Sequence, residues 1–303
     1  MNARDPRAHR RAIVLMIIAP TLWSIAGVVT RQLDFAGRWE VTFWRSLFAA
    51  VFVLAALLAT RGAKTWEAVR ATGGYGVLSG AMWAVMFIAF MLALMTTTTA
   101  NTLIVNSITP LVTALLARAV LREPIAPRTW AAIVLAIAGM LGMYGSGIAG
   151  GEPRHLAGML IALAVPVAAA VNMVTLKHAG RSVDLIPAVL LGAVLSAILT
   201  LPFALPFGAT AHDLVLLAVL GCLQLGFPCM LMVRASPNLS APEIALLALL
   251  EVVLGPLWAW LGAGEAPAPA TLVGGAVVIA ALLLNELAAL GVRARARRGA
   301  RQL

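Results

Sequence analysis

Charged residues are scarce in this sequence. They make up 11% of its 303 residues, whereas apolar residues make up 62% and the mean hydropathy is +0.97. Globular domains carry roughly 25% charged and 45–50% apolar residues. A water-soluble fold of this length cannot bury so much apolar surface. The composition therefore excludes an ordinary soluble protein and indicates one that is surrounded by lipid.

Cysteine and histidine are also rare. The two cysteines, Cys222 and Cys229, stand seven positions apart in one apolar run, and two helical turns hold them too far apart for a disulfide. All four histidines lie outside the apolar runs, which argues against a buried proton relay; they are His9, His155, His178 and His212. The sequence also lacks zinc-ligand spacing, a phosphate-binding glycine loop and a nucleophile elbow. These absences predict no metal, no other cofactor and no enzymatic activity.

The net charge of +10 is concentrated in particular places. In a soluble protein such an excess would suggest a nucleic-acid partner. Here nearly all of the 22 Lys and Arg residues lie before the first apolar run, after the last, or in or beside every second loop; the four exceptions are Arg31, Arg38, Arg45 and Arg154. Loops rich in Lys and Arg stay in the cytoplasm. We therefore expect no nucleic-acid partner, a bacterial-type inner (plasma) membrane location and two cytoplasmic termini.

Ten apolar runs are long enough to cross a bilayer, which takes about 20 residues. They cover residues 12–30, 41–60, 74–95, 98–121, 129–147, 156–176, 185–206, 213–233, 241–263 and 270–291. The first run has no cleavage site of small residues before a polar segment, so it is interpreted as a membrane helix rather than a signal peptide. The sequence predicts an all-α membrane protein with ten transmembrane helices.

The chain also repeats itself. The segment Glu123-Pro-Ile-Ala-Pro-Arg-Thr129 matches Glu265-Ala-Pro-Ala-Pro-Ala-Thr271 at an offset of 142 residues, and a long apolar helix precedes each copy. The repeat divides the chain into residues 1–150 and 151–303, with five predicted spans in each half. Because five is odd, the halves enter the membrane with opposite topology. Such inverted repeats are common in secondary transporters, whose substrate site lies between the repeats.

Motifs in both halves carry a family resemblance. The first half contains Asn106-Ser-Ile-Thr-Pro-Leu111 followed by Glu123-Pro124, and the second contains Leu249-Leu-Glu251 followed by Gly255-Pro-Leu-Trp258. Together they resemble the ten-helix, EamA-type branch of the drug/metabolite transporter superfamily. The resemblance implies two five-helix repeats around a central cavity. It also implies similarity to members that export aromatic and other neutral amino acids.

Polar and aromatic residues inside the predicted spans are candidates for a substrate site, because polar groups in hydrocarbon are costly. Glu251, in the middle of the ninth span, either binds a substrate ammonium or a proton, or is a structural carboxylate capped by backbone N–H groups. The other predicted substrate-binding residues are Trp23, Trp83, Met86, Asn106, Asn172 and Gln224. Helix packing and hydrogen bonds between helices are the alternative for these six.

Two further expectations concern a charge and the backbone. Arg45, in the second span, is expected to extend outward and to pair with Glu40 or a helix C-terminus, with a substrate contact as the alternative. Five prolines are expected to interrupt spans, and their positions in the two halves make them candidate hinges: Pro20, Pro110, Pro166, Pro228 and Pro256.

These features predict a secondary transporter that exports amino acids or related small metabolites by alternating access. The alternatives are a multipass membrane enzyme acting on a lipid-linked substrate, and an exporter of drugs or other metabolites. The expected partners are the small-molecule substrate and the lipid bilayer, and the protein is expected to be a monomer or a homodimer.

Overall fold

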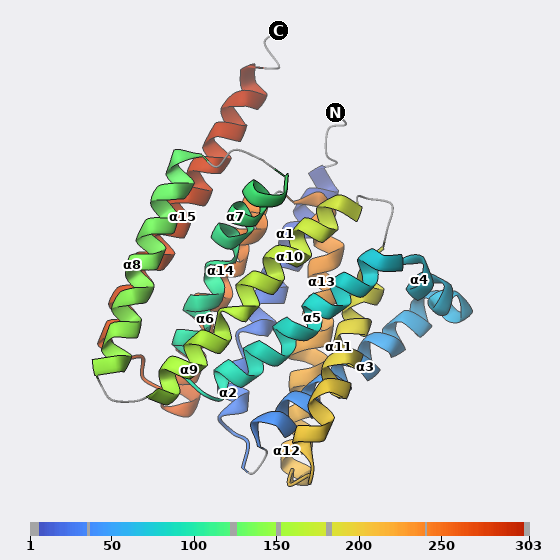
Figure 1. The fold of residues 1–303 in the computed structure, drawn as a ribbon. Helices are drawn as coiled ribbons and strands as arrows, with labels where there is room; N and C mark the ends of the chain where they lie inside the picture. The colour runs from blue at the N-terminus through green and yellow to red at the C-terminus, as the bar shows by residue number, and fades with distance from the viewer. Residues whose placement is uncertain are drawn as a thin grey trace.

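The computed structural model describes residues 6–34, 37–121, 126–149, 153–179, 184–239 and 241–299. The regular elements in these ranges are helices (Figure 1). In chain order they are α1 (Pro6–Trp23), α2 (Ala26–Thr30), α3 (Arg38–Arg61), α4 (Thr65–Ala71), α5 (Gly73–Leu94), α6 (Thr99–Ser107), α7 (Thr109–Leu121), α8 (Pro127–Ala149), α9 (Pro153–Ala162), α10 (Ala164–Ala179), α11 (Ile186–Ala204), α12 (Ala211–Val219), α13 (Phe227–Ala235), α14 (Ala241–Ala263) and α15 (Pro269–Gly299). A π-helical segment, Leu220–Gly226, joins α12 to α13, and short 3₁₀ turns cover Gly62–Lys64 and Ser236–Asn238.

Within the described residues, seven helical segments are long and apolar enough to cross a membrane. They are Arg7–Thr30, Arg38–Ala71, Gly73–Leu94, Thr99–Val120, Pro153–Thr175, Ile186–Ala204 and Ala211–Asn238. Three shorter apolar helices, Pro127–Gly142, Leu247–Ala263 and Pro269–Asn285, lie where the remaining spans are predicted. The all-helical prediction is confirmed for the described residues, whereas the count of ten spans stays a prediction.

The bundle has an apolar outside and a partly polar inside. Val77, Leu261 and Val273 on its surface are 66%, 69% and 68% exposed. In the interior, Ser46 and Ser196 are completely buried and their hydroxyl oxygens lie 2.8 Å apart in a hydrogen bond. Lipid does not penalise exposed apolar side chains, and it favours polar groups that bond between helices. The distribution of side chains is therefore that of a membrane protein.

The two ends of the bundle carry different connections. At the terminal end, at the top of Figure 1, α1 begins and α15 ends. At the opposite end, the distal end, lie the α2–α3, α11–α12 and α14–α15 connections (Figure 1). Glu123 falls outside the described residues, but α7 ends and α8 begins at the terminal end. The loop that carries Glu265 is at the distal end.

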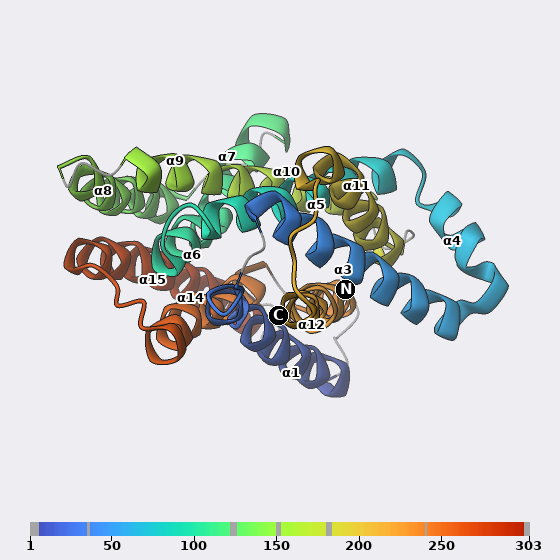
Figure 2. The same ribbon diagram turned by 90° about the horizontal axis from the view of Figure 1, so that it is seen from below.

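Helices from the two halves of the sequence interleave. α3 and α5 from the first half pack on α11 from the second, and α8 packs on α15 (Figure 2). α1 contacts α13 and α14, while α10 contacts α5 and α7. The halves therefore share one interior, and a site there can take side chains from both.

Four of the five predicted proline interruptions coincide with helix breaks. Pro20 precedes the turn between α1 and α2. Pro110, Pro166 and Pro228 stand in the first turns of α7, α10 and α13, each of which follows a break or a π-helical segment. Proline is tolerated there because the first N–H groups of a helix have no intrahelical partner.

Pro256 does not interrupt its helix, contrary to the prediction. α14 continues through this residue from Ala241 to Ala263, as α11 continues through Pro202. Proline removes one backbone hydrogen bond and crowds the preceding turn, but a helix held by its neighbours can continue with a kink. The hinge role of all five prolines stays a prediction.

The contact between α5 and α11 depends on two glycines. A Cβ on Gly192 would lie 2.4 Å from the Cβ of Trp83 and 3.0 Å from the carbonyl oxygen of Gly80. Small residues allow helix backbones to approach closely in a membrane, where van der Waals packing rather than the hydrophobic effect holds helices together. This close approach fixes Trp83 in the interior.

We expect Gly192→Ala to destabilise the protein, because the added methyl group has no room beside Trp83. Overpacking of this kind costs about 1–3 kcal/mol. Gly142→Ala in α8 is the matched control, since a Cβ there meets nothing within 4 Å. Thermal unfolding in detergent should show a lower midpoint for Gly192→Ala and an unchanged or higher midpoint for the control. Equal midpoints for the two variants would contradict the close contact between α5 and α11.

Candidate functional site

A buried arginine lies at the polar centre of the interior. Arg45 in α3 is 2% exposed, and its Nε donates a hydrogen bond of 3.1 Å to Oε1 of Gln224. Its guanidinium carbon is 5.6 Å from the ring centroid of Phe90 in α5, which is a cation–π distance. Charged residues in membrane spans are costly and commonly mark functional sites. Arg45 therefore makes this part of the interior the candidate site.

Gln224 is held at both ends of its amide. It lies in the π-helical segment Leu220–Gly226, and its Nε2 donates to the carbonyl oxygen of Trp23 at 3.2 Å. That oxygen is available because α1 ends at Trp23. A Cβ on Gly221 would lie 2.6 Å from the carbonyl oxygen of Arg45, so the glycine lets the segment approach α3. The helix break and the π-helical turn, a feature often found at functional sites, together direct Gln224 to Arg45.

Several polar groups in the interior have no hydrogen-bond partner among the described residues. Arg45 Nη1 and Asn106 Oδ1 are both buried, and neither has a hydrogen-bond partner in this part of the chain. Glu251 in α14 is half-buried and interacts electrostatically with Arg45. No described backbone N–H donates to its carboxylate, so the cap expected of a purely structural Glu251 is missing from this part of the chain. Arg45 from the first half and Glu251 from the second thus share one interior without a direct hydrogen bond.

The predicted aromatic and methionine residues also lie in the interior. Trp23 is half-buried against the thiol of Cys229. Trp83 and Met86 are buried in an apolar cluster formed mainly by α3, α5, α10, α11 and α13. Trp83 packs there against Phe87, with ring centroids 5.5 Å apart. The structure brings these three side chains to the inside of the bundle, and their contact with a substrate stays a prediction.

The predicted amides differ in their partners. Asn172 in α10 accepts a hydrogen bond of 2.7 Å from the hydroxyl of Ser79 in α5. Gln224 bonds to Arg45, as described above, whereas Asn106 keeps an unsatisfied oxygen. Two of these amides therefore join helices, and the third has an oxygen without a partner among the described residues. A substrate contact of any of the three stays a prediction.

The expected pairing of Arg45 with Glu40 is wrong. The carboxylate of Glu40 accepts hydrogen bonds from the backbone N–H groups of Gly208 and Ala209 at 3.0 and 2.8 Å. Arg45 turns to the interior instead, because a long side chain can reach either the surface or the core and only the packing decides. Arg45 was missing from the predicted site residues. The signal that could have placed it there was a single arginine inside a long apolar run.

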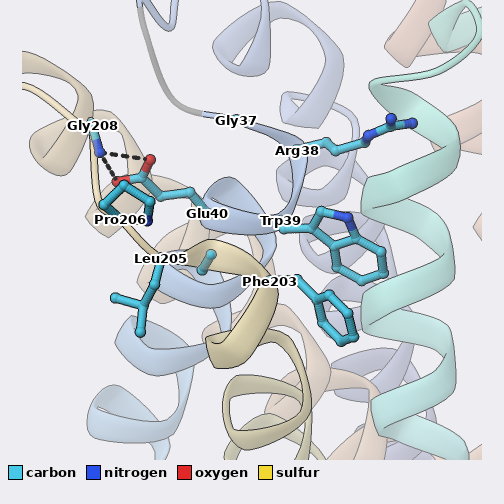
Figure 3. A pocket seen from close by; sticks show the side chains of 9 residues that line it. Gly37, Arg38, Trp39, Glu40, Phe203, Leu205, Pro206 and Gly208 are labelled. Carbon is cyan, nitrogen blue, oxygen red and sulfur yellow. Dashed lines mark hydrogen bonds between the residues drawn. The ribbon is translucent and has the colours of Figure 1, made fainter.

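A separate pocket of about 380 Å³ opens at the distal ends of α3 and α11 (Figure 3). Its lining residues are Gly37, Arg38, Trp39, Glu40, Phe203, Ala204, Leu205, Pro206 and Gly208. None of the predicted substrate-binding residues is among them. Trp39 and Phe203 pack side by side at its wall, with ring centroids 4.9 Å apart (Figure 3). Aromatic side chains at a helix end are typical of the membrane–water interface, so this pocket is not our candidate site.

Polar contacts at the distal end join the two halves. Arg31 donates from Nε to Glu265 at 2.8 Å and from Nη2 to the carbonyl oxygen of Thr97 at 3.0 Å. Glu265 also accepts hydrogen bonds from the hydroxyl and the backbone N–H of Thr99. The side chains of Arg31 and Glu265 are 28% and 16% exposed, so water screens their attraction less than that of a surface pair. We call these four residues the distal network.

Asp34, His212 and Asp213 form a second link at the distal end. Their potential ligand atoms lie within 4.8 Å of one another, which is close enough for a shared metal ion. However, the carboxylate of Asp213 already accepts from the backbone N–H of Asp34 and completes a capping box with Thr210 at the start of α12. Asp34 and His212 are both exposed, and their side chains are 3.3 Å apart. The group therefore connects the halves and is not a built metal site.

The sequence pattern of the EamA-like transporter family matches this chain twice, over residues 10–145 and 156–287. The two matches cover most of the chain. It belongs to the EamA-like transporter family. Members of this family are membrane transporters of small metabolites and not enzymes. The family, the apolar helices and the polar interior together establish a multipass membrane transporter.

A solved structure supports the same fold for this EamA-like transporter. A crystal structure titled only "Crystal structure of protein" has a TM-score of 0.65 and 19% sequence identity to it, and the match covers 92% of this chain and 98% of the other. At this identity the likeness shows the fold alone. No curated protein sequence matches the chain.

The two native cysteines of this EamA-like transporter allow a test of the distal network. In a Cys222→Ser background, the remaining Cys229 is buried in the interior. Glu265→Gln removes the ion pair with Arg31. If the contact between the halves is weakened by about 1.4 kcal/mol, the fraction of molecules in which the distal end is open rises roughly tenfold. A water-soluble thiol reagent should then label Cys229 roughly tenfold faster.

The matched control for this labelling is Glu67→Gln. Glu67 is exposed on the short helix α4 and is not part of the distal network. It should leave the rate unchanged. Identical labelling rates for the two Glu→Gln variants would mean that the distal network does not hold this end of the bundle closed.

Proposed function

We propose that this EamA-like transporter exports amino acids or related small metabolites across a bacterial inner membrane by alternating access. The observation that carries the proposal is the distal network, in which Arg31, Thr99 and Glu265 join the halves by contacts that can break. Ionisable side chains from both halves lie in the interior that these contacts would close. Opening this end while the other closes would expose the interior to each side of the membrane in turn. The export direction rests on the resemblance to amino-acid exporters.

The proposal includes ten spans in two inverted repeats, residues 1–150 and 151–303, around a central substrate site. The helix contacts support this symmetry. A twofold axis between the halves would exchange each span with the span five places further along the chain. This exchange leaves two contacts unchanged, that of the second and seventh spans (α3 and α11) and that of the fifth and tenth (α8 and α15). The contacts of α1 with α13 and α14 map onto those of α10 with α5 and α7. A pseudo-twofold axis between the halves would produce this pattern.

The distribution of Lys and Arg predicts that the terminal end faces the cytoplasm and the distal end faces outward. Ala126→Cys and Ala268→Cys, each in a chain without native cysteines, test this orientation. A membrane-impermeant thiol reagent added to intact cells should label the protein with Ala268→Cys and spare the one with Ala126→Cys. Labelling of both positions from one side would contradict the inverted repeats.

The interior favours a substrate that carries an ammonium group. Glu251 is half-buried, and the described residues provide its carboxylate with no hydrogen bond. A carboxylate in hydrocarbon is stable only when it is protonated or paired. An amino-acid ammonium would supply both a positive charge and hydrogen-bond donors. Apolar side chains in the interior, such as half-buried Trp23, suit a substrate with an apolar side chain.

Transport by the purified protein in proteoliposomes tests the proposed function. A panel of labelled aromatic, other neutral, acidic and basic amino acids should include at least one neutral member that moves down its gradient faster than in protein-free liposomes. If only drugs or other metabolites move, the alternative exporter function is correct. If nothing moves and a lipid-linked substrate is modified instead, the protein is a membrane enzyme.

Glu251→Gln should fold normally and transport at least about tenfold more slowly than wild type, because the amide keeps the size of the carboxylate but loses its charge. Glu67→Gln, the same change on an exposed helix, is the control and should transport normally. A structural role would give the opposite pattern, namely a lower unfolding midpoint with residual transport. Normal transport by Glu251→Gln from about pH 5 to about pH 8 would exclude a substrate or proton contact.

A further inference from the structure

We infer that Arg45 binds the carboxylate of the transported molecule and makes this group a requirement for binding. The inference rests on the proposed transport function, because it names the residue that recognises the acid end of an amino-acid substrate.

Arg45 is a buried cation without an ion pair among the described residues. It is 2% exposed within a membrane-spanning helix, so its charge is out of reach of bulk water. Glu251 lies in the same interior, but no hydrogen bond joins the two side chains. A buried charge is stabilised well only when direct hydrogen bonds accompany the opposite charge. An anion that arrives with the substrate would complete this pairing.

The guanidinium group is fixed on one side and lacks a hydrogen-bond partner on another. Its Nε is bonded to Gln224, and the ring of Phe90 lies next to it. Gln224 acts as a positioning residue, because the carbonyl oxygen of Trp23 holds the far end of its amide. Nη1 is buried and lacks a partner in the described part of the chain. The protein thus orients the arginine and leaves one of its donors available for a ligand.

The chemistry of the unpaired donor favours a carboxylate. Guanidinium is planar and presents parallel N–H groups that match the two oxygens of a carboxylate. Arg45 comes from the first half of the chain and Glu251 from the second, and their charges are opposite. A zwitterionic amino acid would satisfy both groups at once. An amine would leave Arg45 without a partner, and a plain carboxylate would leave Glu251 without one.

Binding measurements with ligands that differ in one charged group test the inference. The probes are leucine and phenylalanine, their amides, which lack the carboxylate, and their N-acetyl derivatives, which lack the ammonium. Thermal stabilisation of the purified protein over a range of ligand concentrations gives each affinity. Wild type should bind the amides about tenfold or more weakly than the amino acids. Arg45→Gln should lose about 10- to 100-fold in affinity for both carboxylate classes and none for the amides.

Three further variants separate recognition from folding. Arg45→Lys keeps the charge but not the planar fork, so it should fold and bind carboxylates about tenfold more weakly. Gln224→Leu should weaken carboxylate binding less than Arg45→Gln does and should keep the preference for amino acids over amides, as expected for a positioning residue. Arg61→Gln removes an arginine that is paired with Asp184 outside the site, and it should bind like wild type.

The outcomes distinguish this inference from the proposed function. If amino acids are transported but Arg45→Gln binds them as wild type does, or wild type binds amides equally well, the inference is wrong and the transport function stands. If N-acetyl derivatives bind through Arg45 but no amino acid is transported, the inference holds and amino-acid export is wrong. A folded wild type that no carboxylate stabilises would also overturn the inference.

Discussion

The hydrogen bond between Arg45 and Gln224 requires three departures from regular helix geometry at one place in the bundle. First, α1 must end at Trp23 to free a carbonyl oxygen. Second, the segment Leu220–Gly226 between α12 and α13 must widen into a π-helix. Third, Gly221 must lack a side chain so that this segment can approach α3. In hydrocarbon, backbone groups freed from a helix need partners inside the protein. The side-chain amide of Gln224 supplies the partner for the carbonyl oxygen of Trp23. The irregular backbone is therefore stable only because it lies in the interior that both halves share.

The helices could be predicted from the sequence because hydrocarbon leaves the backbone of an apolar run few alternatives to a helix. The short helix α4 could not be predicted in this way, since it is too short and too polar to form a span. The effect of a proline was only partly predictable. Pro110 follows a break between α6 and α7, whereas Pro256 lies within the continuous helix α14. The difference depends on the neighbours that hold each helix, which a single sequence does not show.

The candidate site was predictable in its residue types but not in its pairs. Ser79 and Asn172 are 93 residues apart, and Arg45 and Gln224 are 179 apart, so no local spacing relates them. A polar residue in an apolar run shows that a partner must exist, but its identity depends on how the helices pack. The direction of Arg45 was predicted wrongly for this reason. The sequence was compatible with a side chain directed outward or inward. The position of the π-helical segment, which carries Gln224, selects the inward direction.

The strength of the distal network limits any transport cycle that opens it. Glu265 accepts three hydrogen bonds, from Arg31 and twice from Thr99, which together contribute on the order of 5 kcal/mol. Reversing a two-state population from 1:99 to 99:1 takes a similar energy, about 5.5 kcal/mol. A substrate can supply this only through the part of its binding energy that differs between the two states. A cation that gains a direct partner only when substrate is present, as we propose for Arg45, would provide such a difference. Uniform apolar contacts would bind the substrate equally in both states and leave the distal end closed.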